Sequence, residues 1–273
     1  IFGSALDLGA VEQGEAFEVT TMLDDSFDGL TLAQEAVDGG GLSLREALAF
    51  AGDGAVITFQ QGLTGVMDLS TLGTALTIDK SLTIIGNGAA QTILDANDAS
   101  RVLEITGDGS DQVSLQNMTL RDGSAAIMDG GNVHVTGTDL SLTNVTISLG
   151  YVSGGRGGGL YLNAASSLTA TGSGISDNSI YSNGGAPTLG GGVFSLGDVT
   201  LVDTTVSGNS VENRGDEAIG GGLHVSGALS ITGGSVTNNE AGANAGSGFG
   251  AAKGAGVYAT GTVTLNGTAI TNN

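Results

Sequence analysis

The segment Gly190-Gly191-Gly192-Val193-Phe194, a glycine triplet followed by an aliphatic residue and a ring, decides the fold because the chain repeats it. The other copies are Gly157-Gly158-Gly159-Leu160-Tyr161, Gly220-Gly221-Gly222-Leu223-His224 and Gly254-Ala255-Gly256-Val257-Tyr258. The four segments begin 33, 30 and 34 residues apart. A period of this length is typical of solenoids, in which each repeat forms one coil of a stack.

A second phrase keeps the same period and ends each time in asparagine. Its copies are Ile175-Ser176-Asp177-Asn178, Val206-Ser207-Gly208-Asn209, Val236-Thr237-Asn238-Asn239 and Ile270-Thr271-Asn272-Asn273. It follows alternating stretches such as 199–202 and 229–232, whose pattern predicts strands with one buried face. We therefore expect an all-β fold, a right-handed single-stranded parallel β-helix in which each repeat supplies strand, turn, loop and strand.

Stacking of the coils places equivalent residues of successive repeats above one another, about 4.8 Å apart. The asparagines are then expected to share amide hydrogen bonds as an internal ladder, and the rings to stack inside the coils. The expected members are Asn178, Asn209, Asn239 and Asn273 for the first ladder and Tyr161, Phe194, His224 and Tyr258 for the second. His224 is assigned to stacking because it aligns with three aromatic residues, and the other histidine, His134, has no cysteine or paired histidine nearby to build a metal site, so neither is assigned any chemistry.

The first half of the chain predicts smaller coils that are preceded by one helix. Strand-like segments occur at 56–59, 76–78, 82–85, 92–94, 102–105 and 113–115, separated by turn formers. The helix is expected over 44–51, where Ser43 and Glu46 have the spacing of a capping box. Its apolar face predicts a lid over the first coil, and Arg45 is expected to be solvated or salt-bridged.

Composition and charge exclude several classes of function. The 273 residues carry 28 acidic and 7 basic side chains, a net charge of −21, so no basic patch is expected to bind nucleic acid or anionic membranes. The absence of cysteine excludes disulfides, thiol catalysis and cysteine-ligated zinc. No run of 18 apolar residues occurs, so we expect no membrane insertion.

Catalysis is weighed because parallel β-helices also serve as polysaccharide lyases and glycosidases. Asp122, Asp177, Asp198 and Asp203 are candidate carboxylates for a glycosidase, but the chain has no tryptophan and its few cations suit an anionic sugar badly. We expect no enzyme and assign no catalytic residue.

Calcium is the single cofactor that the sequence suggests. Asp24, Asp25 and Asp28 lie in one glycine-containing loop, and Asp108 and Asp111 lie in another. Carboxylates in tight loops are common Ca²⁺ ligands, although neither loop has the spacing of a helix-loop-helix site. We expect any bound calcium to affect stability rather than catalysis.

The segment Gly41-Leu42-Ser43-Leu44-Arg45-Glu46-Ala47-Leu48, followed by Gly54-Ala55-Val56-Ile57-Thr58-Phe59, resembles the entry motif of the bacterial CSLREA-motif β-helix repeat proteins. Gly41 stands where that motif usually has cysteine. Together with Leu82-Thr83-Ile84-Ile85-Gly86 and the later repeats, the resemblance covers residues 17–273. The repeats are also similar to those of large adhesins and autotransporter passengers.

The resemblance implies a right-handed parallel β-helix in an extracellular or cell-surface bacterial protein. The functional residues of the family are undefined, so none is transferred to this chain. The phrase Asp7-Leu8-Gly9-Ala10-Val11-Glu12 resembles the ending of such a unit. We therefore expect 1–16 to be the end of a preceding unit or a linking segment, 17–55 the N-terminal cap, and 56–273 the coils.

The last residues, 265–273, predict half a coil without a polar cap, so the stack is expected to continue. Either the polypeptide runs on, or another copy docks by strand addition, unless the flanks were simply trimmed. The main functional hypothesis is thus an extracellular building block of a fibre, filament or giant repeat protein, with copies of itself as partners. The alternative is an adhesin that binds glycan or another cell surface through the inserts 181–189, 212–219 and 240–253. A polysaccharide-degrading enzyme is the second alternative.

Overall fold

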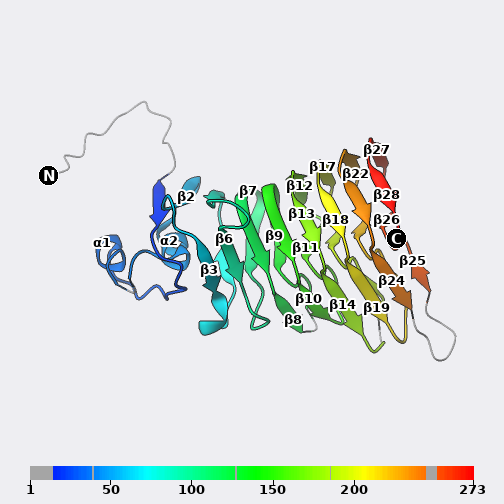
Figure 1. Cartoon of the computed structure of the whole chain (residues 1–273), viewed down its shortest axis with the longest axis horizontal. Helices are drawn as coiled ribbons and strands as arrows, with labels where there is room; N and C mark the ends of the chain where they lie inside the picture. The colour runs from blue at the N-terminus through cyan, green and yellow to red at the C-terminus, as the bar shows by residue number, and fades with distance from the viewer. Residues whose placement is uncertain (1–14, 39, 127, 185, 244–250) are drawn as a thin grey trace.

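The computed structural model describes residues 15–38, 40–126, 128–184, 186–243 and 251–273. It is an all-β parallel solenoid with two short α-helices at its N-terminal end, which confirms the expected fold class (Figure 1). The strands lie side by side from β1 at one end to β27 and β28 at the other, and the pairings between successive coils are parallel. The alternating repeats therefore form a linear stack.

Each coil contributes strands to the same faces of the stack. The first face contains β1 (Ala16–Val19), β2 (Ala55–Phe59), β5 (Leu82–Ile85), residues 113–116 of β7 (Leu103–Arg121), residues 139–143 of β9 (Val133–Ser148), β12 (Ser167–Thr171), β17 (Val199–Val202), β22 (Leu229–Thr232) and β27 (Val263–Asn266). The second face contains β3 (Gly65–Asp68), β6 (Thr92–Asp95), residues 119–121 of β7, residues 146–148 of β9, β13 (Gly174–Ser176), β18 (Thr205–Ser207), β23 (Ser235–Thr237) and β28 (Ala269–Thr271).

The third face and two smaller sheets complete the coils. The third face contains β4 (Leu76–Ile78), residues 103–105 of β7, residues 133–135 of β9, β11 (Leu160–Leu162), β16 (Val193–Ser195), β21 (Leu223–Val225) and β26 (Val257–Ala259). The smaller sheets are formed by β8 (Ser124–Ala126), β10 (Tyr151–Ser153), β14 (Ser179–Ser182), β19 (Ser210–Asn213) and β24 (Glu240–Ala243), and by β15 (Thr188–Leu189), β20 (Ala218–Ile219) and β25 (Ala252–Lys253).

The turns between faces use residues that tolerate the left-handed backbone region. Asn117, Asn144 and Asp203 have φ of 55°, 53° and 47° between the first and second faces. Asp177 and Asn238 have φ of 56° directly after the second face. Asn and Asp adopt this region more readily than other side chains that carry a Cβ, which explains why the repeats place them where the chain bends.

The core is a narrow aliphatic interior that follows the alternation of the strands. In β17, Val199 and Leu201 are buried whereas Thr200 and Val202 face outward and are half-buried. Register partners extend this pattern to Leu229 and Ile231 in the next coil. Burial of apolar area contributes about 25 cal/mol per Å², so these stacked columns are the main source of folding free energy.

The N-terminal end of the core is closed by helix α2 (Leu44–Phe50), which contacts β1, β2 and β4. Its apolar residues Leu44, Ala47 and Leu48 are buried, as the lid prediction requires. The helix ends one residue before the expected 44–51, because Ala51 adopts ψ of 128°. A second helix, α1 (Leu32–Glu35), and a 3₁₀ turn, η1 (Leu69–Thr71), were not anticipated.

The boundary between cap and coils differs from the prediction, because β1 lies inside the segment 17–55 that was expected to be a cap. Phe17 and Val19 are buried, and β1 pairs in parallel with β2. The 35 residues between these strands, 20–54, include both helices, so β1 and β2 form the first strand pair of the solenoid across a long insertion. The phrase at 7–12 and most of the segment 1–16 lie outside the described residues.

Candidate functional site

The structure brings the four expected asparagines together in one ladder, in which Asn178, Asn209 and Asn239 are buried and Asn273 is exposed. Nδ2 of Asn178 donates to Oδ1 of Asn209, Nδ2 of Asn209 to Oδ1 of Asn239, and Nδ2 of Asn239 to Oδ1 of Asn273, each at 2.9 Å. The same oxygens also accept backbone N–H bonds, such as that from Asn178 to Asn209 at 3.0 Å. Each asparagine thus connects its own coil to the next, and its loss would leave buried groups unpaired at about 1–3 kcal/mol each.

The ladder has a further member, Asn132, that the sequence prediction missed. Its Nδ2 donates to Oδ1 of Asn178 at 3.1 Å, and its Oδ1 accepts the backbone N–H of Gly123 at 2.8 Å. A signal was present, because 130–134 reads Gly-Gly-Asn-Val-His and is a degenerate copy of the glycine phrase, 27 residues before the next. Asn132 here occupies the place of the third glycine.

The four expected rings form a second ladder, whose members are register partners on β11, β16, β21 and β26. The centroids of Tyr161, Phe194, His224 and Tyr258 are separated by 5.5, 5.0 and 5.1 Å, with the rings within 23° of parallel. The expectation that the rings lie inside the coils is wrong. Leu160 and Leu162 belong to the core, so alternation directs the ring between them to the outer side of the third face.

The ring ladder starts one coil earlier than predicted, with His134, which stacks on Tyr161 at 4.9 Å. Its Nδ1 lies 2.7 Å from Oε1 of Glu104, whose other oxygen is paired with Arg101 at 3.1 Å. Burial pushes the pKa of Glu104 upward, but the hydrogen bond and charge of His134 and the charge of Arg101 outweigh it and hold that pKa below its usual value. This end of the ladder is therefore an ion-paired cluster.

Arg156 covers two neighbouring rings of the ladder, Tyr161 and Phe194. Its guanidinium carbon lies 5.1 Å from the centroid of Tyr161 and 4.9 Å from that of Phe194. The same guanidinium binds both carboxylate oxygens of Asp129, at 2.6 and 3.2 Å, and this hydrogen bonding raises the pKa of Arg156. The cation–π contacts and the ion pair explain how Phe194 is buried on an outward side of the sheet.

His224 is a buried member of the ring ladder. The side chain is buried between Phe194 and Tyr258, and its Nδ1 has no hydrogen-bond partner among the described residues. Burial lowers the pKa of His224, and the charge of Arg156 adds to that effect. The ring is therefore neutral at physiological pH, in agreement with an assignment to stacking.

The cap residues Ser43 and Glu46 form the expected capping box at the start of α2. The backbone N–H of Ser43 donates to Oε2 of Glu46 at 2.7 Å, and that of Glu46 to Oγ of Ser43 at 3.2 Å. Arg45 is salt-bridged, as expected, through two hydrogen bonds to Asp24.

A second buried carboxyl group, Glu35, lies against this capping box. Its Oε1 accepts the backbone N–H of Leu30 at 3.1 Å, while its Oε2 and Oε1 of Glu46 are buried and accept no hydrogen bond from the described residues. Burial raises the pKa of Glu46 most strongly, the bonds from Ser43 oppose this rise, and Glu35 raises it further. One proton shared between the two carboxyl groups would satisfy both oxygens.

The two acidic loops proposed for calcium do not gather their carboxylates. Among the described residues no group of three or more His, Cys, Asp or Glu side chains is placed to hold a metal ion. In the first loop Asp24 is bound to Arg45, while Asp25 and Asp28 accept hydrogen bonds from Ser26. The arrangement gives the calcium prediction no support there.

In the second loop the carboxylates are likewise used locally. Asp108 accepts the N–H and hydroxyl of Ser110 at 2.9 and 2.7 Å, and Asp111 accepts the hydroxyl of Ser81 at 3.0 Å. The bonds from Ser110 lower the pKa of Asp108. Serine donors therefore hydrogen-bond both carboxylates.

The carboxylates considered for glycoside hydrolysis occupy turns. Asp122, Asp177 and Asp203 each have φ between 47° and 56° where the chain leaves a face. Asp198 precedes β17 and accepts the backbone N–H of Ala228 at 2.8 Å. The positions of Asp122, Asp177 and Asp203 follow from the backbone requirements of the bends.

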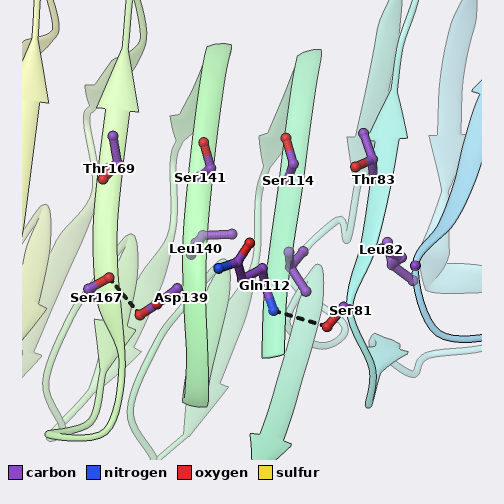
Figure 2. A pocket seen from close by; sticks show the side chains of 12 residues that line it. Ser81, Leu82, Thr83, Gln112, Ser114, Asp139, Leu140, Ser141, Ser167 and Thr169 are labelled. Carbon is purple, nitrogen blue, oxygen red and sulfur yellow. Dashed lines mark hydrogen bonds between the residues drawn. The ribbon is translucent and has the colours of Figure 1, made fainter. Parts of the chain in front are cut away.

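A shallow cavity of ≈ 520 Å³ lies on the outer side of the first face, across four successive coils; we call it the first-face groove (Figure 2). Figure 2 shows two rows of side chains along it, each with one residue per strand. One row is Ser81, Gln112, Asp139 and Ser167, and the other is Thr83, Ser114, Ser141 and Thr169. The lining is almost wholly uncharged, because Asp139 is its single ionisable group.

The last described coil exposes positions that are buried in the coil before it. Val263 and Leu265 are 44% and 49% exposed, whereas their partners Leu229 and Ile231 are 1% exposed. Ile270 is 41% exposed opposite the buried Val236. We call this surface, formed by β26, β27 and β28, the open coil face.

Comparison with known proteins found no matching family model, no matching curated protein and no matching solved structure. The resemblance to the CSLREA-motif repeat proteins therefore stays a prediction. Within the described ranges, no helix has the length and apolar character needed to cross a membrane.

Proposed function

We propose that this chain is a rigid building block of an extended extracellular or cell-surface structure, in which solenoid coils stack end to end. The observation that carries this proposal is the pair of ladders, in which asparagines and rings of successive coils are joined by the same contact at each step. A further coil, from the same polypeptide or from a second copy, could repeat the same step.

The aliphatic columns of the core support the same function. Val199 and Leu229 are register partners, and their column repeats from coil to coil. Ladders and columns that run through successive coils make a solenoid stiff along its axis, a property that suits a fibre or spacer.

The test combines the intact mass of the natural product with electron microscopy. We expect either a polypeptide far larger than 26.6 kDa or filaments assembled from a chain of this size. Leu265→Asp should abolish filaments by placing a charge in the stacked core, whereas Thr264→Asp, which lies on the outer side of the same strand, should leave them intact. A natural product of this size that stays monomeric at high concentration contradicts the proposal.

The rival hypothesis is an adhesin that binds through the inserts 181–189, 212–219 and 240–253, of which residues 185 and 244–250 lie outside the described part. The feature that favours it is Arg214, which lies 5.3 Å from the ring of Tyr181 and joins two neighbouring inserts. Monomers that bind a glycan array, and lose that binding on Tyr181→Ala, would favour the adhesin.

A further inference from the structure

We propose that the first-face groove binds a linear, uncharged polysaccharide whose chain runs along the solenoid axis. The groove belongs to neither the open coil face nor the inserts, so this binding is independent of end-to-end stacking.

The periodicity of the lining defines the shape of the ligand. Thr83, Ser114, Ser141 and Thr169 are register partners, so their hydroxyl groups recur about every 4.8 Å from coil to coil. The second row repeats at the same spacing, two residues away along each strand. A ligand that satisfies both rows must itself be a repeating chain that crosses the strands at right angles.

The chemistry of the lining defines the class of ligand. Hydroxyl groups and the amide of Gln112 both donate and accept hydrogen bonds, as the hydroxyl groups of a sugar do. No lysine or arginine lines the groove, and Asp139 together with the net charge of −21 disfavours anionic polymers. Asp139 is instead an acceptor for sugar hydroxyl groups. The volume of ≈ 520 Å³ lies within the usual range of ligand sites.

Hydrogen bonds hold part of the groove lining in place before any ligand arrives. Ser167 donates to Asp139 at 2.7 Å, and Ser81 accepts the backbone N–H of Gln112 at 3.2 Å while it donates to Asp111 (Figure 2). Preorganisation of this kind reduces the entropy lost on binding. The lining has no aromatic platform, so affinity must come from repetition over several coils, which favours polymers over single sugars.

A peptide strand is a poorer occupant of this groove. The strands that carry it, β5, β7, β9 and β12, each have a hydrogen-bonded neighbour on both sides, so no free backbone edge is available for strand addition.

The test is electrophoresis of the whole chain in native gels that contain dextran, laminarin or hydroxyethylcellulose, three neutral glucans. We expect retardation by at least one of them. The double variant Ser114→Arg/Ser141→Arg should weaken that retardation at least tenfold, because it fills the groove and removes two hydrogen-bonding hydroxyl groups. The matched control is Ser148→Arg/Ser176→Arg, a pair of half-buried register partners on the second face.

Circular dichroism melting of both double variants checks that each remains folded. Retardation that is lost in the groove variant and kept in the control supports the proposal. No retardation by any of the three glucans, equal loss in both double variants, or retardation only by the anionic polymer polygalacturonate would overturn it. Filament formation is scored separately with Leu265→Asp, so failure of either proposal leaves the other measurable.

Discussion

The early and late coils of this solenoid are packed with different side chains. In the early coils, the interior is filled by bulky apolar side chains such as Ile57, Met67 and Leu76, and α2 covers the end. The late coils, from β9 onward, place smaller aliphatics such as Val199 and Ala170 in the core and add the asparagine and ring ladders.

The difference shows which interactions stabilise each half. In the early half, a bulky apolar core and a helical lid supply most of the stabilising contacts. In the late half, ladders made of identical steps add contacts between each coil and the next. We therefore expect substitutions in the late coils to change stability through the ladder contacts. In the cap, we expect them to change stability through burial and protonation.

The largest effect is expected from Phe194→Ala in the middle of the ring ladder. The change removes a fully buried ring, two stacking contacts and one cation–π contact, so the free energy of unfolding should fall by about 4 kcal/mol in urea titrations. His134→Ala at the end of the ladder removes one stacking contact and the bond to Glu104, so it should cost only about 2 kcal/mol. Equal losses would mean that the ladder does not act as a stack.

Asn209→Ala should lower the free energy of unfolding by about 3 kcal/mol. It leaves the backbone N–H of Asn178 and the carbonyl of Ile175 without their partners in a buried position. Asn183→Ala is the control, because that asparagine is exposed, has no positive φ, and its side chain accepts only the hydroxyl of Tyr181 outside the ladder. Hydrogen exchange should show that protection is lost at Asn178 and its neighbours. A loss of protection spread evenly over the chain would contradict a ladder in which each step stabilises its own pair of coils.

In the cap, Glu46→Gln should raise the free energy of unfolding by about 1 kcal/mol at pH 7. The pKa of Glu46 is raised in the folded state, so its stabilising contribution is complete below the ordinary carboxyl pKa and is lost as the pH rises through the folded pKa. Glutamine keeps the acceptor for Ser43 and cannot ionise, so the difference between variant and wild type should vanish near pH 4. Exposed Glu240→Gln serves as the control and should change nothing.

The smallest effect concerns His224. Its pKa is lowered in the folded state, so the unfolded chain binds a proton more readily and stability falls as the pH drops below about 6.5. His224→Phe keeps the ring but not the proton. The free energy of unfolding is measured by urea titration at pH 7.5 and at pH 5.5. Its decrease between these two pH values should be larger for the wild type than for the variant, by under about 1 kcal/mol. Identical decreases would argue against a buried neutral imidazole.

Much of the fold could be predicted because the repeats are regular. The period of the glycine phrase predicts the coils. The recurring positions predict which residues pair with Asn178 and Tyr161. Asn132 and His134 were missed because their copy of the phrase is degenerate. The side on which the rings lie was also missed, although the alternation around Tyr161 specifies it.

Other features could not be derived, because they depend on contacts between distant segments. Strand β1 is short, and its partner β2 follows only after a long insertion that contains both helices. The first-face groove combines residues such as Ser81, Gln112 and Asp139 from separate coils, and no local motif connects them. Its existence follows from the register of stacked strands, which only the three-dimensional structure supplies.

Because the chain has no cysteine, pairs of introduced cysteines test the in-register stack of coils directly. Thr200 and Ser230 are register partners on the outer side of adjacent first-face strands, and Thr264 lies one coil further. Cysteines at 200 and 230 should lie about 5 Å apart and be bridged within one chain by dibromobimane, whereas cysteines at 200 and 264 should lie about 10 Å apart and not be bridged. Efficient bridging of the second pair, or none of the first, would contradict the stacked solenoid.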